Sequence, residues 1–265
     1  MIKSTVITIT YNAEAVFART AESVLKQSYP HVEHLIIDGA SGDKTLSMAY
    51  AYKMRSDEQQ NGHEVLLTSE PDEGIYDAMN KGLQQATGDY LVFMNAGDCF
   101  HDEQVLQRIA DMATGMPMPA VIFGDTDVVD SEGRFLYHRR LSPPKILTWR
   151  SFRHGMLVCH QAFYARTDIA KGIAYNRQYR YSADVDWCIR VMKEAEKRQL
   201  PLRNADAVVA DYLEEGQTTL HHRDSLKERF DVMRRHYGLL PTLLMHAWFF
   251  VRAGWWKLTA SRRSG

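Results

Sequence analysis

The sequence predicts an α/β protein with a mostly parallel sheet flanked by helices and a helical C-terminal extension. Short apolar runs alternate with stretches of helical periodicity over roughly the first hundred residues, which is typical of a parallel sheet with helical crossovers. Each apolar run ends in a polar or glycine-rich turn. The last segment, from residue 221, is charged and helical in its periodicity.

The first half supplies most of the sheet. The run at 5–10 is rich in β-branched residues, which favour strands. Together the predicted strands of this half are 5–10, 34–37, 64–69 and 90–94. The predicted helices between them are 15–27, 44–55 and 77–86. Pro30 follows the first helix and Gly88 the third, as is common where helices end.

The second half is less regular. Its predicted elements are a helix at 102–112, a strand at 120–124, a hairpin turn at 131–133, a helix at 184–197, a strand at 207–212, a turn at 214–216 and a helix at 222–237. Residues 138–153 contain Pro143 and Pro144 and predict a long loop that shapes a binding groove. We expect one main domain over 1–220, with halves 1–100 and 101–220, and an extension over 221–265.

Composition excludes several classes of protein. The chain has 265 residues, 45% of them hydrophobic and 25% charged, which is ordinary for a globular protein. Its net charge of −1 gives no overall field that attracts nucleic acid. The three cysteines, Cys99, Cys159 and Cys188, are too widely spaced for a metal motif, and so sparse a set suggests a reducing compartment. We find no signal peptide and no apolar span long enough to cross a bilayer, so we expect a cytoplasmic protein.

Polar residues follow the predicted strands, and parallel strands bring such turns to one edge of the sheet. They are Tyr11 and Asn12, Asp38, the stretch 70–76, and the turn from Asn95 to Asp98. Ligands of open α/β sheets bind at this edge. A carboxylate there can hold a hard divalent cation, although Asn, Gly and Asp are also common in turns that bind nothing. Phosphate loops, dinucleotide fingerprints, serine-hydrolase motifs and zinc-protease motifs are absent from the sequence.

Four segments resemble, in the right order, the GT-A fold glycosyltransferases of family 2. They are residues 6–12, 21–30, 33–45 and 88–98. A further segment, 69–82, looks like a family 2 subgroup common in bacterial cell-surface polysaccharide pathways. The resemblance implies a GT-A fold, with the nucleotide-sugar donor bound by 1–100 and the acceptor by 101–220.

The activity implied by the resemblance is transfer of a sugar, with inversion, from a nucleotide-sugar donor to a glycan or a lipid-diphosphate-linked acceptor. Asp38 would accept a hydrogen bond from the base, which suits UDP; the alternative is that Asp38 caps the turn at 41–45. The implied donor-binding residues are Thr10, Tyr11, Asn12, Asp38, Asp72, Asp77, Asn80, Asn95 and Gly97. For Asp77 and Asn80, a solvated helix face is an equal alternative.

The turn from Asn95 to Asp98 is similar to the Asp-X-Asp metal motif of the family. Asn95 and Gly97 stand where acids are expected, so only Asp98 keeps a charge. We expect Mg²⁺ or Mn²⁺ to be held by Asp98 together with the diphosphate of the donor. The metal would neutralise the departing nucleoside diphosphate.

The segment 181–190 is similar to the Glu-Asp segment that carries the base of the family. Ala183 replaces the glutamate, and Asp184 is the implied catalytic base. The alternative is an aspartate that only stabilises its helix N-terminus, by about 0.3–1 kcal/mol. Acceptor or diphosphate contacts are expected from Arg139, Arg140, His160, Gln161 and Asp186. A hydrogen-bonded core histidine and a solvated basic loop are the alternatives for His160 and for the two arginines.

The tail at 248–258, followed by Arg262 and Arg263, combines aromatic and basic residues. This composition is typical of helices that lie on a membrane surface, and a helix docked on protein is the alternative. A membrane-bound tail favours a lipid-linked acceptor and a peripheral position on the inner face of the cytoplasmic membrane. Two other functions remain open: a non-catalytic sugar-nucleotide-binding or assembly subunit, and a nucleotidyltransferase, which would need a glycine-rich basic loop that residues 8–12 lack.

Overall fold

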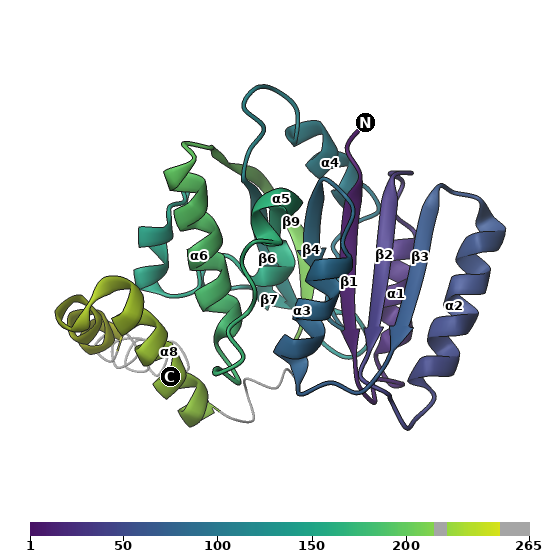
Figure 1. Cartoon of the computed structure of the whole chain (residues 1–265), viewed down its shortest axis with the longest axis horizontal. Coiled ribbons are helices and arrows are strands. Elements are labelled where there is room, and N and C mark those ends of the chain that lie inside the picture. Colours follow the sequence, from purple (N-terminus) through teal and green to yellow (C-terminus); the bar gives the residue numbers. More distant parts are fainter. Residues whose placement is uncertain (215–221, 250–265) are drawn as a thin grey trace, which may run out of the picture.

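In a computed structural model, which describes residues 1–214 and 222–249, one sheet forms the centre of the molecule (Figure 1). Its strands follow the order β3-β2-β1-β4-β8-β6-β9-β5, and β7 pairs with β6. The strands are β1 (Ser4–Thr10), β2 (Val32–Asp38), β3 (His63–Ser69), β4 (Tyr90–Phe93), β5 (Cys99–Phe100), β6 (Val121–Val129), β7 (Phe135–His138), β8 (Phe163–Arg166) and β9 (Leu202–Leu213).

Helices cover both faces of the parallel half of the sheet (Figure 1). The helices are α1 (Phe17–Leu25), α2 (Thr45–Gln59), α3 (Ile75–Gln85), α4 (Val105–Met112), η1 (Trp149–His154), η2 (His160–Ala162), α5 (Thr167–Ala170), α6 (Ala183–Lys197) and α8 (His222–Tyr237). Ile36 and Ile37 are neighbours on β2, so their side chains point to opposite faces. Ile37 lies in one apolar cluster with Leu83 of α3, and Ile36 in another with Phe17 of α1 and Tyr52 of α2.

The predicted fold class is confirmed. Strands β1, β2, β3 and β4 are parallel, and β8 then runs antiparallel to both β4 and β6. All seven residues of β1 and all seven of β2 are buried, as expected for strands covered on both faces. The carboxyl ends of β1, β2 and β4 therefore meet at one edge, where the sequence places its polar turns.

The second half differs from the prediction in the lengths of its elements. Strand β6 continues past the predicted end at residue 124 to Val129, and β9 begins at Leu202 instead of residue 207. The two strands pair in parallel over most of their length, so the backbone N–H and C=O groups of their polar residues form hydrogen bonds across the pair. The 3₁₀ helix η1 takes up the last residues of the loop predicted at 138–153, and Thr148 and Ser151 make a capping box at its start. The predicted hairpin turn joins β6 to β7.

The C-terminal segment packs on α6 and η1 through α8. His236 Nε2 lies 2.7 Å from Asp186 Oδ1 of α6, and the ring of Tyr237 stacks on Trp149 of η1 with 5.5 Å between centroids. A further helix follows at 239–249. Most of the predicted turn at 214–216, and the predicted tail beyond residue 249, lie outside the described residues.

All three cysteines are free and buried. Among the described residues, none of the helices combines the length and the apolar character needed to cross a bilayer.

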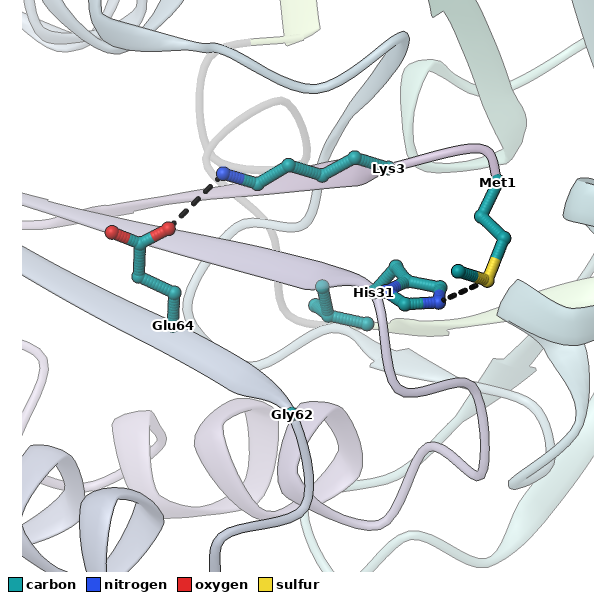
Figure 2. A pocket seen from close by; sticks show the side chains of 6 residues that line it. Met1, Lys3, His31, Gly62 and Glu64 are labelled. Carbon is teal, nitrogen blue, oxygen red and sulfur yellow. Dashed lines mark hydrogen bonds and ion pairs between the residues drawn. The ribbon is translucent and has the colours of Figure 1, made fainter.

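A cavity of about 370 Å³ opens at the amino ends of β1, β2 and β3 (Figure 2). It is lined by Met1, Lys3, His31, Val32, Gly62 and Glu64, and Lys3 there pairs with Glu64 at 3.0 Å. This cavity lies at the end of the parallel strands opposite to the polar turns. It is therefore separate from the candidate site described next.

Candidate active site

The turn after β4 has a backbone that only glycine tolerates at its third residue. Gly97 has a φ of +102°, and a Cβ built on it would lie 2.8 Å from a methyl carbon of Leu213. The Gly97 N–H donates a 2.8 Å hydrogen bond to the hydroxyl of Thr20 on α1, and that hydroxyl donates to the Asp98 carbonyl at 2.7 Å. These contacts explain in physical terms why this chain carries no acid at position 97.

Asp98 is buried at the end of this turn, and both of its carboxylate oxygens accept hydrogen bonds. Oδ1 accepts the Leu213 N–H at 3.0 Å, and Oδ2 accepts the Gln161 side-chain amide at 2.7 Å. Burial raises the pKa of Asp98 above its usual value, against the lowering effect of these two hydrogen bonds. Metal ligation by Asp98 stays a prediction, because it requires an oxygen to be shared with, or released by, the Gln161 amide.

His160 lies between Asn95 and Asp184. The Asn95 amide nitrogen is 3.0 Å from His160 Nε2, and His160 Nδ1 is 3.5 Å from Asp184 Oδ2. Because the amide nitrogen is a donor, Nε2 accepts and the ring proton lies on Nδ1, facing the carboxylate. The structure thus brings together four residues predicted from separate segments: Asn95 after β4, His160 and Gln161 of η2, and Asp184 in the first turn of α6.

The environment of Asp184 favours its ionised form. Burial opposes ionisation, but the hydrogen bond from His160 and the backbone N–H of Val185 outweigh it, so the pKa of Asp184 lies below its usual value. Tyr76 of α3 hydrogen-bonds the backbone of Ala183 and Asp184 and fixes the start of α6. An ionised, anchored carboxylate has the properties of a general base.

Three buried oxygens in this group have no hydrogen-bond partner within the described part of the chain. They are Asn95 Oδ1, Gln161 Oε1 and Asp184 Oδ1. Buried acceptors of this kind need a donor or a cation. Amide and carboxylate oxygens are also the ligands that Mg²⁺ and Mn²⁺ prefer, so the residues around the turn fit a hard divalent cation.

Tyr212 also lies in the site, and the sequence analysis missed it. Burial and then the charges of Asp98 and Asp184 raise the pKa of its hydroxyl. The sequence around Tyr212 gives little indication of this role, because a single tyrosine near the polar end of a strand matches no motif. The neighbouring Asp98 contact of Leu213 shows that this strand end packs directly on the turn after β4.

Both carboxylate oxygens of Asp38, at the end of β2, accept hydrogen bonds from within the protein. The hydroxyls of Thr10 and Ser69 donate to it at 3.1 and 2.6 Å, and the Ser41 N–H donates at 3.1 Å. These donors outweigh burial and hold the pKa of Asp38 below its usual value. The capping arrangement named as the alternative is therefore present, and a contact between Asp38 and a base stays a prediction.

Beside Asp38, the exposed ring of Tyr11 forms an open surface. Tyr11 is 67% exposed, and Gly39 approaches both this ring and Asp72 so closely that a Cβ on Gly39 would overlap the Asp72 carboxylate. Asn12 has a φ of +48°, and its Oδ1 accepts the Gly42 N–H at 2.9 Å. Of the predicted nucleotide contacts at this edge, Tyr11 and Asn12 are exposed, and Asp72 is half-buried with its Oδ1 accepting the Gly74 N–H at 2.8 Å.

Asp77 and Asn80 of α3 make internal contacts. Asn80 donates to the Tyr175 carbonyl at 3.1 Å and accepts the Tyr175 N–H at 2.7 Å, so both ends of its amide are occupied. Asp77 pairs with Arg177 at 3.2 Å and is partly buried. These contacts fix the segment after α5 against α3, and a direct donor contact of either residue stays a prediction.

Two of the residues predicted to contact acceptor or diphosphate hold the fold together. Arg139 donates to the carbonyls of Leu141 and Met156, both at 2.6 Å, and so pins the loop after β7. Asp186 accepts a hydrogen bond from Arg190 Nε at 2.7 Å and lies 2.7 Å from His236 Nε2. Residues two positions apart on an α-helix are rotated by about 200° about its axis, so Asp186 and Asp184 point in nearly opposite directions. Arg140 is exposed.

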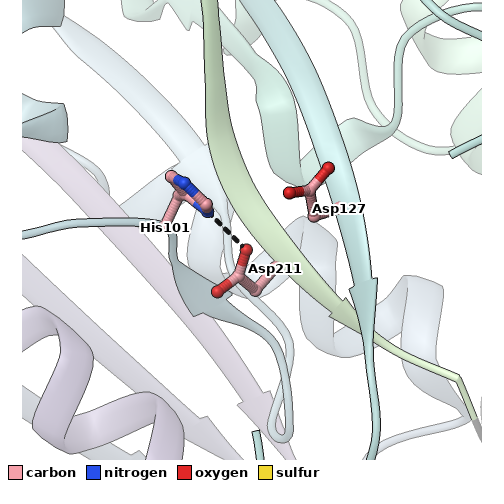
Figure 3. A group of neighbouring side chains, drawn as sticks. All are labelled: His101, Asp127 and Asp211. Atoms are coloured by element: carbon pink, nitrogen blue, oxygen red, sulfur yellow. Dashed lines mark hydrogen bonds and ion pairs between the residues drawn. The ribbon is translucent and has the colours of Figure 1, made fainter. Parts of the chain in front are cut away.

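A second group of titratable residues lies near the ends of β5, β6 and β9 (Figure 3). His101 is 2.8 Å from Asp211, and Asp127 is 2.7 Å from His138, so each carboxylate has a histidine partner. Thr126, the neighbour of Asp127, instead hydrogen-bonds Cys159, which lies close to the charges of Asp98 and Asp184. Adjacent strand residues face opposite ways, so this group lies on the other face of the sheet from the candidate site.

Comparison with known proteins finds similar sequences over most of the chain. The family model described as Glycosyl transferase family 2 matches residues 5–178. A "PGL/p-HBAD biosynthesis glycosyltransferase" of Mycobacterium bovis (strain BCG / Pasteur 1173P2) is 29% identical over 246 residues, which are 92% of this chain and 90% of the relative. An uncharacterized glycosyltransferase of Mycobacterium tuberculosis (strain ATCC 25618 / H37Rv) is 31% identical over 70% of this chain and 67% of its own length.

Solved structures with a similar fold include two glycosyltransferases. Residues 1–349 of Staphylococcus aureus TarS, in complex with UDP-GlcNAc, align with a TM-score of 0.69 and 19% identity over 88% of this chain and 65% of that one. The mannosyltransferase PcManGT of Pyrobaculum calidifontis, in complex with GDP-Man and Mn²⁺, aligns with a TM-score of 0.61 and 16% identity over 98% of this chain and 80% of that one. Since the family model covers well over half of the sequence, the chain is a glycosyltransferase of the GT-A fold and belongs to glycosyl transferase family 2.

Proposed function

We propose that this chain is an inverting glycosyltransferase that takes its sugar from a nucleotide-sugar donor, with Asp184 as the general base. The observation that carries the proposal is the group Asn95–His160–Asp184 beside Asp98, at the carboxyl ends of the strands. A UDP-sugar is the expected donor. TarS, which binds UDP-GlcNAc, supports a UDP donor, whereas PcManGT binds GDP-Man.

In the proposed reaction, Asp184 removes the proton from an acceptor hydroxyl while the oxygen attacks the anomeric carbon of the donor sugar. The carbon–oxygen bond to the diphosphate breaks, and the nucleoside diphosphate leaves from the opposite face, which inverts the configuration. The lowered pKa of Asp184 keeps it ionised before the reaction. His160, held by Asn95, donates to Oδ2 and leaves Oδ1 free for the incoming proton.

Mg²⁺ or Mn²⁺ would be held by Asp98 and the amide oxygen of Asn95, and when bound it would neutralise charge on the diphosphate. The buried Asn95 Oδ1, which has no hydrogen-bond partner among the described residues, supports this assignment, and the Gln161 amide must yield part of its contact with Asp98. On the donor side, Tyr11 and Asp72 would contact the nucleotide base and ribose. The exposed Tyr11 ring is suited to stacking.

For the acceptor, we propose a saccharide or a lipid-linked saccharide used in the assembly of a surface polysaccharide, at the inner face of the cytoplasmic membrane. Its support is the relative that acts in PGL/p-HBAD biosynthesis, together with the aromatic and basic C-terminal tail. Arg140, exposed on the loop after β7, remains available for a phosphate of such an acceptor.

A panel of nucleotide sugars, tested for binding and thermal stabilisation with and without Mn²⁺, examines the proposal. We expect UDP and at least one UDP-sugar to stabilise the chain, and the metal to strengthen the effect. Release of UDP during incubation with a glycan or lipid extract would then mark transfer, whereas pyrophosphate release would indicate a nucleotidyltransferase. Donor binding without any turnover would favour the non-catalytic subunit.

A further inference from the structure

The helix at 239–249 has one face that packs on the protein. Thr242 is fully buried, and the ring of His246 lies edge-on to Phe230 of α8 with 4.9 Å between centroids. Phe249 lies on the same side, 5.5 Å from His246. These contacts attach the helix to α8, at the periphery of the molecule (Figure 1).

The other face of this helix is apolar and open. Its exposed residues are Leu239, Leu240, Leu243, Leu244 and Trp248, with exposed fractions of 55%, 68%, 48%, 64% and 54%. Spacings of three and four residues place them on one side of the helix. Single exposed apolar residues are common on protein surfaces, but a continuous stripe of this kind marks an interaction surface.

Charge is distributed around this stripe in a way that favours an anionic partner. No Asp, Glu, Lys or Arg occurs between Arg235 and Arg252. From residue 229 to the C-terminus, Asp231 is the only acidic residue. The basic residues of the same segment are Arg229, Arg234, Arg235, Arg252, Lys257, Arg262 and Arg263. Arg234 and Arg235 share Asp231 as their ion-pair partner, at 2.7 and 2.8 Å, so the segment still carries an excess of positive charge.

We propose that the outer face of the 239–249 helix docks on the surface of a bilayer that contains anionic phospholipid. An apolar stripe with an exposed tryptophan, flanked by cations, is the pattern of helices that lie in the interface. The uncharged stretch between Arg235 and Arg252 is shorter than the roughly 20 apolar residues that a spanning helix needs, and it contains Gly238 and Pro241, so it suits the interface better than the interior of the bilayer.

A second copy of this chain is a less suitable occupant. In a two-fold dimer through this face, two segments that each carry an excess of cations in their sequence would have to approach one another. Anionic lipid instead complements this excess of positive charge. The apolar stripe and the flanking charge therefore favour the lipid surface.

Docking would place the candidate active site close to the membrane. Asp186 of α6 bonds His236 of α8, and the same helix α6 carries Asp184 in its first turn. The ion pair between α6 and α8 thus connects the element that bears the docking surface to the helix that carries the proposed base, which would suit a lipid-linked acceptor. Only this consequence rests on the proposed function; the docking surface itself does not.

Co-sedimentation of the full chain with vesicles tests the proposal. The vesicles contain phosphatidylglycerol and phosphatidylethanolamine, or phosphatidylcholine alone as the neutral reference. The test variant is Leu240→Glu/Leu244→Glu. The control is Met54→Glu/Ile146→Glu, which changes two residues that are 64% and 83% exposed elsewhere. Circular dichroism and thermal unfolding establish that each variant is folded.

We expect the wild-type chain and the control to bind the anionic vesicles at least about tenfold better than the test variant, and better than they bind neutral vesicles. Added salt should weaken this binding without abolishing it, because part of it is apolar. Equal vesicle binding by a folded test variant would overturn the proposal. So would a dimer, seen by light scattering, that the test variant loses while the wild-type chain fails to bind vesicles.

Discussion

The side-chain amide of Gln161 donates a 2.7 Å hydrogen bond to the buried carboxylate of Asp98. Its neighbour His160 contacts Asn95 and Asp184. The two consecutive residues of η2 therefore connect the turn after β4 to the first turn of α6. Removing either contact should have a distinct effect, because Gln161 satisfies a buried charge whereas His160 faces the proposed base.

Gln161→Leu should destabilise the protein by roughly 1–3 kcal/mol, because it leaves a buried carboxylate oxygen of Asp98 without its donor. Burial already raises the pKa of Asp98, so losing the donor should raise it further. The loss of stability in Gln161→Leu should be greatest above the pKa of Asp98, because the buried carboxylate is then charged and lacks one of its donors. Urea unfolding at neutral pH measures the change, with Gln59→Leu at the exposed end of α2 as control; equal stability of the two variants would contradict the account.

Gly97→Asp restores an acid at the position where the family motif expects one, yet it should not improve metal binding. The positive φ and the nearby Leu213 side chain should make even Gly97→Ala unfavourable by roughly 1–3 kcal/mol. Gly172→Ala is the matched control, since its Cβ would meet only an ordinary 3.5 Å contact. Thermal unfolding of the three variants tests this, and a stable Gly97→Asp protein with tighter Mn²⁺ binding would show the turn to be more adaptable than we infer.

Asp184 should stay ionised well into the acidic range, so the proposed transfer should be flat down to about pH 5. An aspartate is ordinarily half-protonated near pH 3.9, and His160 holds the pKa of Asp184 lower still against the opposing effect of burial. His160→Leu removes that support, and the acidic limb of kcat/KM should then move up by on the order of one pH unit.

Measured pH profiles of wild type, His160→Leu and His31→Leu decide the role of His160 as a positioning residue. His31 lies at the amino ends of the strands and serves as the control. A fall in rate at every pH, without a shift of the acidic limb, would mean that His160 supports only the fold.

Asp186→Asn should weaken the attachment of α8 without removing the proposed base. Burial opposes the ionisation of Asp186, but His236 and Arg190 outweigh it and hold its pKa below the usual value. A lowered pKa in the folded state gives stability that is present above about pH 4 and is lost as the pH falls through the folded pKa. The variant should therefore be less stable than wild type by roughly 1–3 kcal/mol at pH 7. The difference should shrink below pH 4 in urea unfolding, and a constant difference at all pH values would rule out this ion pair as its source.

The alternation of strands and helices in the first half is predictable because each element carries a strong apolar pattern. Buried strands such as β1 and β2 are apolar on both faces, and Pro30 and Gly88 mark helix ends. The polar ends of β6 and β9 lack such a pattern. Their strand conformation depends on pairing with each other, which a local pattern does not contain.

The sequence predicted which side chains lie near one another better than it predicted the internal contacts of each side chain. The sequence places Asn95, Asp98, His160, Gln161 and Asp184 near one edge, and the structure brings them into contact. The sequence does not reveal that Arg139 donates hydrogen bonds to backbone carbonyls, because a guanidinium can donate to carbonyl oxygens as well as to a phosphate. The partners of such a residue come from distant segments, and only the folded chain assembles them.

The most direct test of the central proposal compares Asp184→Asn with Asp186→Asn in one assay that measures UDP release from a UDP-sugar in the presence of acceptor extract. The two aspartates lie on the same helix turn, but only Asp184 lies beside His160. We predict that Asp184→Asn still binds the UDP-sugar and loses transfer by about 10²–10⁴-fold, while Asp186→Asn retains it. Unchanged turnover in Asp184→Asn would contradict the account.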